Sequence, residues 1–213
     1  MMIYAHRGFS GKFPEATRAA YEAAIKSKVD GLECDIRLTR DLVPVCFHDR
    51  NLKRIANNSK SVSNLSLLEM RALTELITLH ELIEIARNSQ VELLIETKHP
   101  SRFGREVERK VLNEIKESSN TTVISFSWFA VRWLRQRTKR VGFVVANRWR
   151  LLFIPTEIVA IDYELFNRSA WVRKRLAGKK VLLWTVNNVS DIKFRLQISG
   201  VITDRPDLPF RLS

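Results

Sequence analysis

Short apolar runs alternate with longer amphipathic stretches along the chain. The runs with a β-type pattern are residues 2–6, 31–38, 91–97, 122–127, 140–145, 158–162, 180–186 and 200–204. Between them, apolar positions recur with the helical period in residues 15–28, 79–89, 102–118, 129–138, 169–177 and 190–198. Eight strands that alternate with helices predict an α/β chain folded as a closed (β/α)8 barrel.

We expect the outer helix layer of this barrel to be incomplete. The helical pattern is poorly marked in residues 147–156, and the chain ends soon after the eighth run. With 213 residues, the chain suits one small barrel domain spanning 1–213. The main alternative is an open doubly wound sheet, but no glycine-rich phosphate-binding loop supports it.

One further β-type run, residues 43–48, breaks the alternation. Too few residues separate it from the run before for a crossover helix, so it must return antiparallel as a hairpin. A two-residue turn would pair His48 with Glu33, and a turn one residue longer would shift this register. Residues 49–78 would then form an excursion over the rim of the barrel.

Polar, titratable residues stand where several of the predicted strands end. The clusters are His6-Arg7, Glu33 with Asp35, His48-Asp49 and Glu96 with Lys98. The carboxyl ends of parallel strands meet at one rim, where the active sites of such barrels form. We therefore expect these side chains to share one pocket, and this set suits metal-assisted chemistry on an anionic ester such as a phosphate.

The three acids of this set are the predicted metal ligands. Glu33 and Asp35 are two residues apart on a strand, so they share a face and repel each other unless a cation lies between them. Glu96 supplies a third oxygen ligand from the neighbouring strand. Oxygen ligands alone suit Mg²⁺ or Ca²⁺ rather than zinc. The competing interpretation is a surface acid pair neutralised by Arg7 and Lys98.

The cations and imidazoles of the set have predicted roles in phosphate chemistry. Arg7 and Lys98 would hold the non-bridging phosphate oxygens, one through a forked guanidinium and the other as a point charge. His6 and His48 would act as general base and general acid, and we expect His6 to be the base.

The clusters also belong to five short motifs of a known family. HRG at 6–8, PEAT at 14–17, LECDI at 32–36, FHD at 47–49 and IETK at 95–98 together resemble the glycerophosphodiester phosphodiesterases. Trp184 and Asp204, further along the chain, fit the same pattern. The resemblance spans essentially the whole chain. It implies a TIM barrel that hydrolyses glycerophosphodiesters to an alcohol and glycerol 3-phosphate with a divalent cation.

The resemblance implies the same residue roles as the chemistry above. It gives His6 and His48 as the acid–base pair. Glu15, in the PEAT stretch, would lie behind the site, and Trp184 could wall the glycerol side of the pocket. Two residues depart from the family pattern: Ala16 replaces the usual Asn, and Leu42 stands where the turn usually has a Gly.

The charge balance adds a second possible property. The chain has 36 Lys and Arg against 23 Asp and Glu, a net charge of +13, and no acid lies between Glu117 and Glu157. Arg residues alternate there with Trp and Phe, which suits docking on anionic lipid or simply a solvated helix face. One alternative function is thus a lysophospholipase D-type phosphodiesterase at a membrane surface. Another is a non-catalytic basic module that binds nucleic acid or anionic membrane, which the paired acids argue against.

Compartment and redox state follow from what the chain contains. Its first residues, MMIYAHRG, do not have the pattern of a signal peptide. Cys34 and Cys46 lack zinc spacing, although they flank the predicted hairpin and a pairing between them stays open. We expect a cytoplasmic protein, at most peripheral to a membrane.

Overall fold

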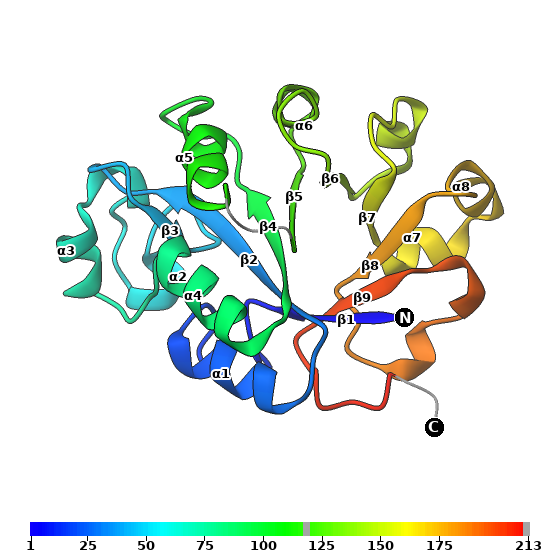
Figure 1. The fold of residues 1–213 in the computed structure, drawn as a ribbon, viewed down its shortest axis with the longest axis horizontal. Coiled ribbons are helices and arrows are strands. Elements are labelled where there is room, and N and C mark those ends of the chain that lie inside the picture. Colours follow the sequence, from blue (N-terminus) through cyan, green and yellow to red (C-terminus); the bar gives the residue numbers. More distant parts are fainter. Residues whose placement is uncertain (117–119, 211–213) are drawn as a thin grey trace.

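The computed structural model describes residues 1–116 and 120–210 as a closed barrel of parallel strands (Figure 1). The parallel strands are β1 (Met2–His6), β2 (Gly31–Leu38), β4 (Glu92–Thr97), β5 (Thr121–Ser125), β6 (Val141–Val145), β7 (Ile158–Asp162), β8 (Lys180–Trp184) and β9 (Gly200–Thr203). Each pairs with its neighbour in chain order, and β1 closes the barrel by pairing with both β9 and β2. All eight predicted runs and the predicted TIM barrel are confirmed.

Alternate residues of the strands point into the barrel or out towards the helices. The inner core consists of Tyr4, Leu94, Ile124, Val144, Ala160, Leu182 and Ile202. Cys34 belongs instead to the larger core between strands and helices. Glu33 and Asp35 therefore face inward, as their spacing predicts. Both cysteines are buried and free.

The helices on the outside leave gaps, as predicted. They are α1 (Arg18–Lys26), α4 (Leu79–Ser89), α5 (Glu106–Glu114), α6 (Trp128–Leu134), α7 (Tyr163–Arg168) and α8 (Ala170–Arg175). After β6 there is only a 3-10 segment, η2 (Arg148–Leu152). Residues 117 and 118, the last two of the predicted helix 102–118, lie outside the described residues. No described helix is both long and apolar enough to cross a bilayer.

The helix predicted over residues 190–198 is wrong. Two 3-10 turns, η3 (Val189–Asp191) and η4 (Arg195–Gln197), take its place. Between them, the ring of Phe194 packs edge-on against Phe166 of α7 and lies under the guanidinium of Arg173. These contacts hold Phe194 in a non-helical conformation, so tertiary packing overrides the helical period.

The antiparallel hairpin is confirmed, but its register is shifted by one residue. Strand β3 (Pro44–Cys46) pairs with β2 so that Cys46 lies opposite Ile36. Thr39 and Val43 close a three-residue turn, in which Leu42 adopts a left-handed φ of 60°. The predicted two-residue turn and the direct pairing of His48 with Glu33 are therefore wrong.

The excursion after β3 packs around its own small core. It contains α2 (Lys53–Ala56), η1 (Val62–Asn64) and α3 (Leu67–Arg71), which lie on the left in Figure 1. Its buried residues are Val45, Phe47, Leu52, Val62, Leu65, Met70 and Leu76. Because this core is separate from that of the barrel, the excursion forms a compact addition to the rim.

Candidate active site

A pocket of about 130 Å³ opens at the carboxyl ends of the barrel strands. Its polar lining includes His6, Arg7, Glu33, His48, Glu96 and Lys98, and its apolar lining includes Phe126 and Trp184. Asp35 lies beneath this lining and binds both Arg7 and Lys98. The structure thus brings the predicted site residues together in one place.

Three carboxylates at this pocket are almost fully buried: Glu33 and Glu96, which line it, and Asp35 next to them. Strand register places Glu33 beside His6, and Asp35 beside Glu96. Asp35 accepts from Arg7 Nε at 2.7 Å and lies 3.1 Å from Lys98 Nζ, which is 2.7 Å from Glu96. Glu33 accepts only from the backbone N–H of Arg7 among the described hydrogen bonds, at 3.1 Å. Among the described residues, Glu33 therefore has no arginine or lysine side-chain donor within hydrogen-bonding distance.

Burial and mutual repulsion divide the protons among these acids. Burial and the charge of Asp35 raise the pKa of Glu33 well above its usual range. The same two causes raise the pKa of Glu96 to about 7. Burial also opposes ionisation of Asp35, but Lys98 and Arg7 outweigh it and lower its pKa to about 2. Asp35 is the ionised member, and the other two hold protons more tightly than exposed acids do.

These residues fit a divalent cation. Among the described residues, ligand atoms of His6, Glu33 and Asp35 all lie within 4.8 Å of one another. Glu96 is outside this group, and its carboxylate lies 2.7 Å from the ammonium of Lys98. Buried carboxylate oxygens are what Mg²⁺ or Ca²⁺ binds, and a divalent cation would take the place of the protons that burial holds on Glu33 and Glu96. The candidate set is thus Glu33 and Asp35, with His6 and Glu96 next to them.

His6 is held in place by a carboxylate at the end of the last strand. Its Nδ1 lies 2.7 Å from Asp204, which also accepts from Ser10 at 2.9 Å and from Asn187 at 2.8 Å. Burial would raise the pKa of Asp204, but the hydrogen bond and charge of His6 lower it to about 2. The ionised Asp204 directs the Nε2 atom of His6 towards Glu33, 4.0 Å away.

His48 has a matching carboxylate of its own. Its Nδ1 lies 2.7 Å from Asp49, the next residue, whose second oxygen accepts from Arg54 Nε at 2.7 Å. Burial lowers the pKa of His48, and Arg7 and Lys98 act in the same direction against the attraction of Asp35. His48 is thereby biased towards its neutral form, with Nε2 free to accept a proton.

The local backbone explains the HRG motif. Arg7 has a left-handed φ of 55°, which lets its N–H reach Glu33 while its side chain reaches Asp35. Gly8 follows with a φ of 81°, and a Cβ there would lie 2.6 Å from the backbone carbon of Ala20. Only glycine fits this close approach of the turn to α1.

The two departures from the family pattern both fall at left-handed positions. Ala16 has a φ of 58° and Leu42 a φ of 60°. Asn and Gly, the usual family residues there, tolerate this conformation best. Ala16 and Leu42 thus stand at positions whose backbone conformation Asn or Gly would adopt more readily.

Several site residues had no predicted role. Asp204 follows the last strand and could have been found by the strand-end rule that identified the others. Ser10, Asn187 and Arg54 come from loops or from the excursion, where the sequence pattern carries no such signal. The two remaining histidines do not line the pocket. His80 pairs with Glu114, and His99 pairs with Glu108.

Comparison with known proteins places this site in a family. The profile of the Glycerophosphoryl diester phosphodiesterase family matches residues 6–208. The chain is 32% identical to "Probable glycerophosphodiester phosphodiesterase 1" of Mycobacterium tuberculosis, over 90% of this chain and 84% of that protein. The chain belongs to the glycerophosphodiester phosphodiesterase family and is a phosphoric diester hydrolase.

Solved structures agree with this placement. The fold is similar to that of the glycerophosphodiester phosphodiesterase of Thermotoga maritima, with a TM-score of 0.88, 26% identity and coverage of 100% and 98% of the two chains. It is also similar to a phosphodiesterase of Oleispira antarctica in complex with its product sn-glycerol-3-phosphate, with a TM-score of 0.82 and 25% identity, over 97% and 94%.

Proposed function

We propose that the enzyme hydrolyses glycerophosphodiesters to an alcohol and glycerol 3-phosphate, with a divalent cation bound at Glu33, Asp35 and Glu96. The observation that carries the proposal is the buried acid cluster open to a pocket that two carboxylate-backed imidazoles line. When bound, the cation supplies Lewis-acid polarisation of a phosphate oxygen. His6 adjoins the cluster as a further candidate ligand.

The side chains of the pocket have complementary tasks in this proposal. Arg7 donates from Nε to Asp35 and from Nη1 to Glu15. Its second terminal nitrogen, Nη2, can therefore bind a phosphate oxygen. Lys98 has a third N–H besides its two acid contacts. The two imidazoles move the protons, one from the attacking oxygen and one to the leaving alkoxide. The order His6 as base and His48 as acid stays a prediction, and the lowered pKa of His48 favours the reverse order.

The direct test is product formation. Purified enzyme, stripped with a chelator, should release glycerol 3-phosphate from glycerophosphocholine only after Mg²⁺ or Ca²⁺ is added back. The mechanism is contradicted if any one of the variants His6→Ala, His48→Ala and Glu33→Ala keeps full turnover. Trp184→Ala should raise KM more than it lowers kcat, because we assign this side chain to the glycerol wall.

A second candidate substrate is a lysolipid, cleaved at a membrane surface. Large apolar side chains stand exposed on the crossovers after β5, β6 and β7: Phe129 is 71% exposed, Trp149 67% and Trp171 48%. Arg132 and Arg148 stack on the neighbouring Trp128 and Trp149 rings. Aromatic and basic side chains together suit an anionic lipid interface.

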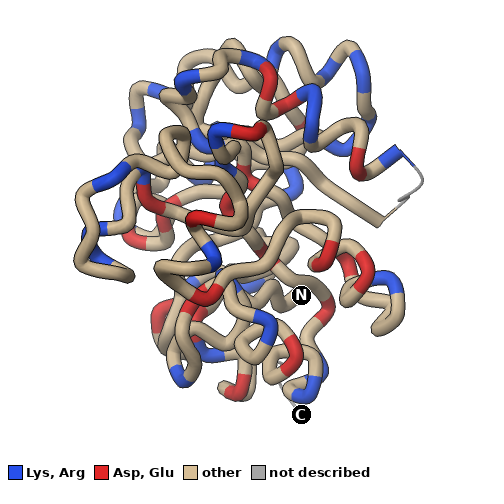
Figure 2. The backbone as a smooth tube through the Cα atoms, turned by 90° about the vertical axis from the view of Figure 1, so that its left-hand side faces the viewer, with Lys and Arg blue, Asp and Glu red and all other residues tan. Residues whose placement is uncertain are grey.

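These crossovers adjoin one another and the pocket. Arg150 of η2 donates to the backbone oxygen of Phe126, a pocket residue, and Arg175 of α8 donates to Leu151 and Leu152 of η2. They lie at the top and right of Figure 1, across from the excursion. On the excursion side, which faces the viewer in Figure 2, acidic residues lie among the basic ones. An acyl chain would thus leave the pocket over the crossovers after β5 and β6, where residues 118–156 include no acid.

Rates on two substrates separate these candidates. The lysolipid proposal requires a higher kcat/KM for lysophosphatidylcholine than for glycerophosphocholine, together with salt-sensitive sedimentation with phosphatidylglycerol vesicles. Equal or lower rates on the lysolipid and no sedimentation would leave the water-soluble diester as the substrate. A nucleic-acid partner has no support beyond net charge.

A further inference from the structure

A chain of short polar contacts joins Arg54, in the excursion, to two pocket residues, His48 and Arg7. Arg54 of α2 donates from Nε to Asp49 at 2.7 Å, and from its two terminal nitrogens to the two oxygens of Glu15, each at 2.7 Å. Asp49 in turn holds Nδ1 of His48, and Glu15 accepts from Arg7 at 3.2 Å. One guanidinium thus stands behind both a catalytic imidazole and a phosphate-binding cation.

We infer that Arg54 is a positioning residue of the active site, fixing His48 through Asp49 and Arg7 through Glu15. The inference rests on the proposed roles of His48 and Arg7. A forked guanidinium is suited to this task, because it binds a carboxylate through two parallel N–H groups and keeps Nε for another. Lysine at the same place would keep the charge and lose the fork.

Arg54 is placed for positioning rather than for holding the fold. Its side chain is 49% exposed, whereas Glu15 and Asp49 are 18% and 23% exposed. Exposed ion pairs contribute little to stability, and the excursion has its own apolar core, to which the neighbouring Leu52 belongs. Loss of Arg54 should therefore leave the chain folded while Asp49 and Glu15 lose their common partner.

The hydrogen bond to Asp49 also selects a form of the His48 ring. A carboxylate at Nδ1 favours the tautomer with hydrogen on Nδ1, which leaves the lone pair on Nε2 facing the pocket. If Asp49 is released from Arg54, the ring and its tautomer become less well defined. This gives a readout that does not depend on turnover.

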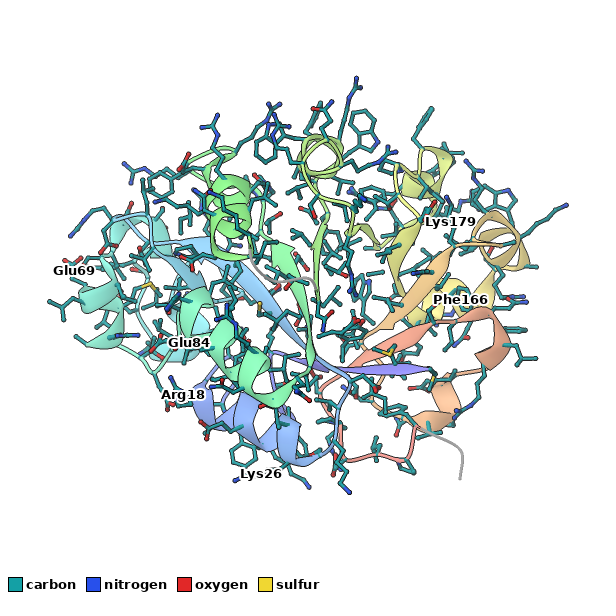
Figure 3. All side chains as sticks on the ribbon, viewed as in Figure 1. Arg18, Lys26, Glu69, Glu84, Phe166 and Lys179 are labelled. Carbon is teal, nitrogen blue, oxygen red and sulfur yellow. The ribbon has the colours of Figure 1, made fainter. Side chains whose placement is uncertain are left out.

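The test compares Arg54→Ala and Arg54→Lys with a matched control, Arg40→Ala. Arg40 is a similarly exposed arginine. It pairs at 2.9 Å with Glu69, which is labelled at the outer edge on the left in Figure 3. We expect Arg54→Ala to lower kcat about 30-fold and to change KM less than threefold. Loss of a residue that orients a site residue through hydrogen bonds commonly lowers activity about 10- to 100-fold. Arg54→Lys should recover only part of the lost kcat. Added guanidinium at about 50 mM should restore kcat in Arg54→Ala. Arg40→Ala should stay within twofold of wild type.

Two further measurements decide between positioning and a merely structural role. ¹⁵N NMR of the imidazole should show the single Nδ1–H tautomer of His48 in wild type and a mixture in Arg54→Ala. The losses of Arg54→Ala and Asp49→Ala should be less than multiplicative in the double variant, because the two residues share the path to His48. Multiplicative losses, an unchanged tautomer or an Arg54→Ala enzyme with wild-type kcat would each overturn the inference.

If Arg54→Ala does not fold, Arg54→Lys carries the same measurements. Absence of wild-type turnover would count against the proposed function instead, and the NMR result would still judge the positioning of His48.

Discussion

The two halves of the catalytic rim are built on opposite principles. From β1 to β4, including the excursion, the rim carries the acids, cations and imidazoles, joined by hydrogen bonds of about 2.7–3.2 Å. From β5 to β8 the pocket wall is Ile124, Phe126, Val144, Ala160 and Trp184, and the surface behind it exposes aromatic rings. The charged half can perform the chemistry, and the apolar half can select what is attached to the phosphate.

This division has a physical cause. Buried charges are tolerated only where partners and hydrogen bonds surround them. The hairpin and the excursion supply such partners on one side, namely Asp49 and Arg54. In the second half only the 3-10 segment η2 follows β6, and the pocket residues there are mostly apolar.

The largest expected effect comes from breaking the charged half at its imidazoles. His6→Ala and His48→Ala should each lower kcat about 10²- to 10⁴-fold, the usual contribution of a general acid or base. His80→Ala is the matched control, because this histidine is exposed on α4 and pairs with Glu114. Steady-state kinetics on glycerophosphocholine measure the effect. Near-normal kcat in either variant would remove that residue from the proton transfers.

The second largest effect is expected on the free energy of unfolding, from a substitution in the backbone turn that carries Arg7 and Gly8. Gly8→Ala combines a left-handed φ with a Cβ 2.6 Å from Ala20, so we expect a loss of about 2–4 kcal/mol in the free energy of unfolding. Gly104→Ala is its control: the φ is 55°, but a Cβ there meets nothing within 4 Å. Urea titration should show a loss of about 1 kcal/mol for it. Equal losses in the two variants would mean that crowding at Ala20 is unimportant.

The acid cluster should make the stability of the cation-free protein depend on pH. The folded pKa of Glu96, about 7, lies above its usual 4.5, so the folded state binds more protons than the unfolded state between these values. The contribution of Glu96 to stability is therefore present below about pH 4.5 and is lost as the pH rises through 7, by about 3 kcal/mol. Because Gln does not titrate, urea titrations of wild type and Glu96→Gln at pH 5 and 8 isolate this effect. A difference that does not change with pH would contradict it.

The smallest expected effect concerns the apolar half. The double variant Phe129→Ser, Trp149→Ser should weaken binding to phosphatidylglycerol vesicles about tenfold, because it removes two exposed rings from the interface, and should leave hydrolysis of glycerophosphocholine unchanged. Leu68→Ser is the control, since Leu68 is 80% exposed on the excursion. If the rim variant and the control bind vesicles equally well, the aromatic side chains are not the docking surface.

Much of this architecture could be predicted from the sequence, because period and strand ends are local signals. The eight strands, the hairpin and the shared pocket followed from them. The hairpin register did not, since it depends on Leu42 adopting a conformation unusual for leucine. Neither did the loss of helix at Phe194, which packs on Phe166, or the role of Arg54, whose partners are distant in sequence. Roles of individual site residues, the domain limits and the compartment stay predictions.

Calorimetric titration of the chelator-treated enzyme with Mg²⁺ and Ca²⁺ tests the central claim most directly, namely that the buried acids bind one divalent cation. At neutral pH we predict one cation per chain and release of protons, since burial holds protons on Glu33 and Glu96. Binding should be lost in Glu33→Gln and Asp35→Asn. A chain that binds no cation and still hydrolyses glycerophosphocholine at its full rate would contradict the account.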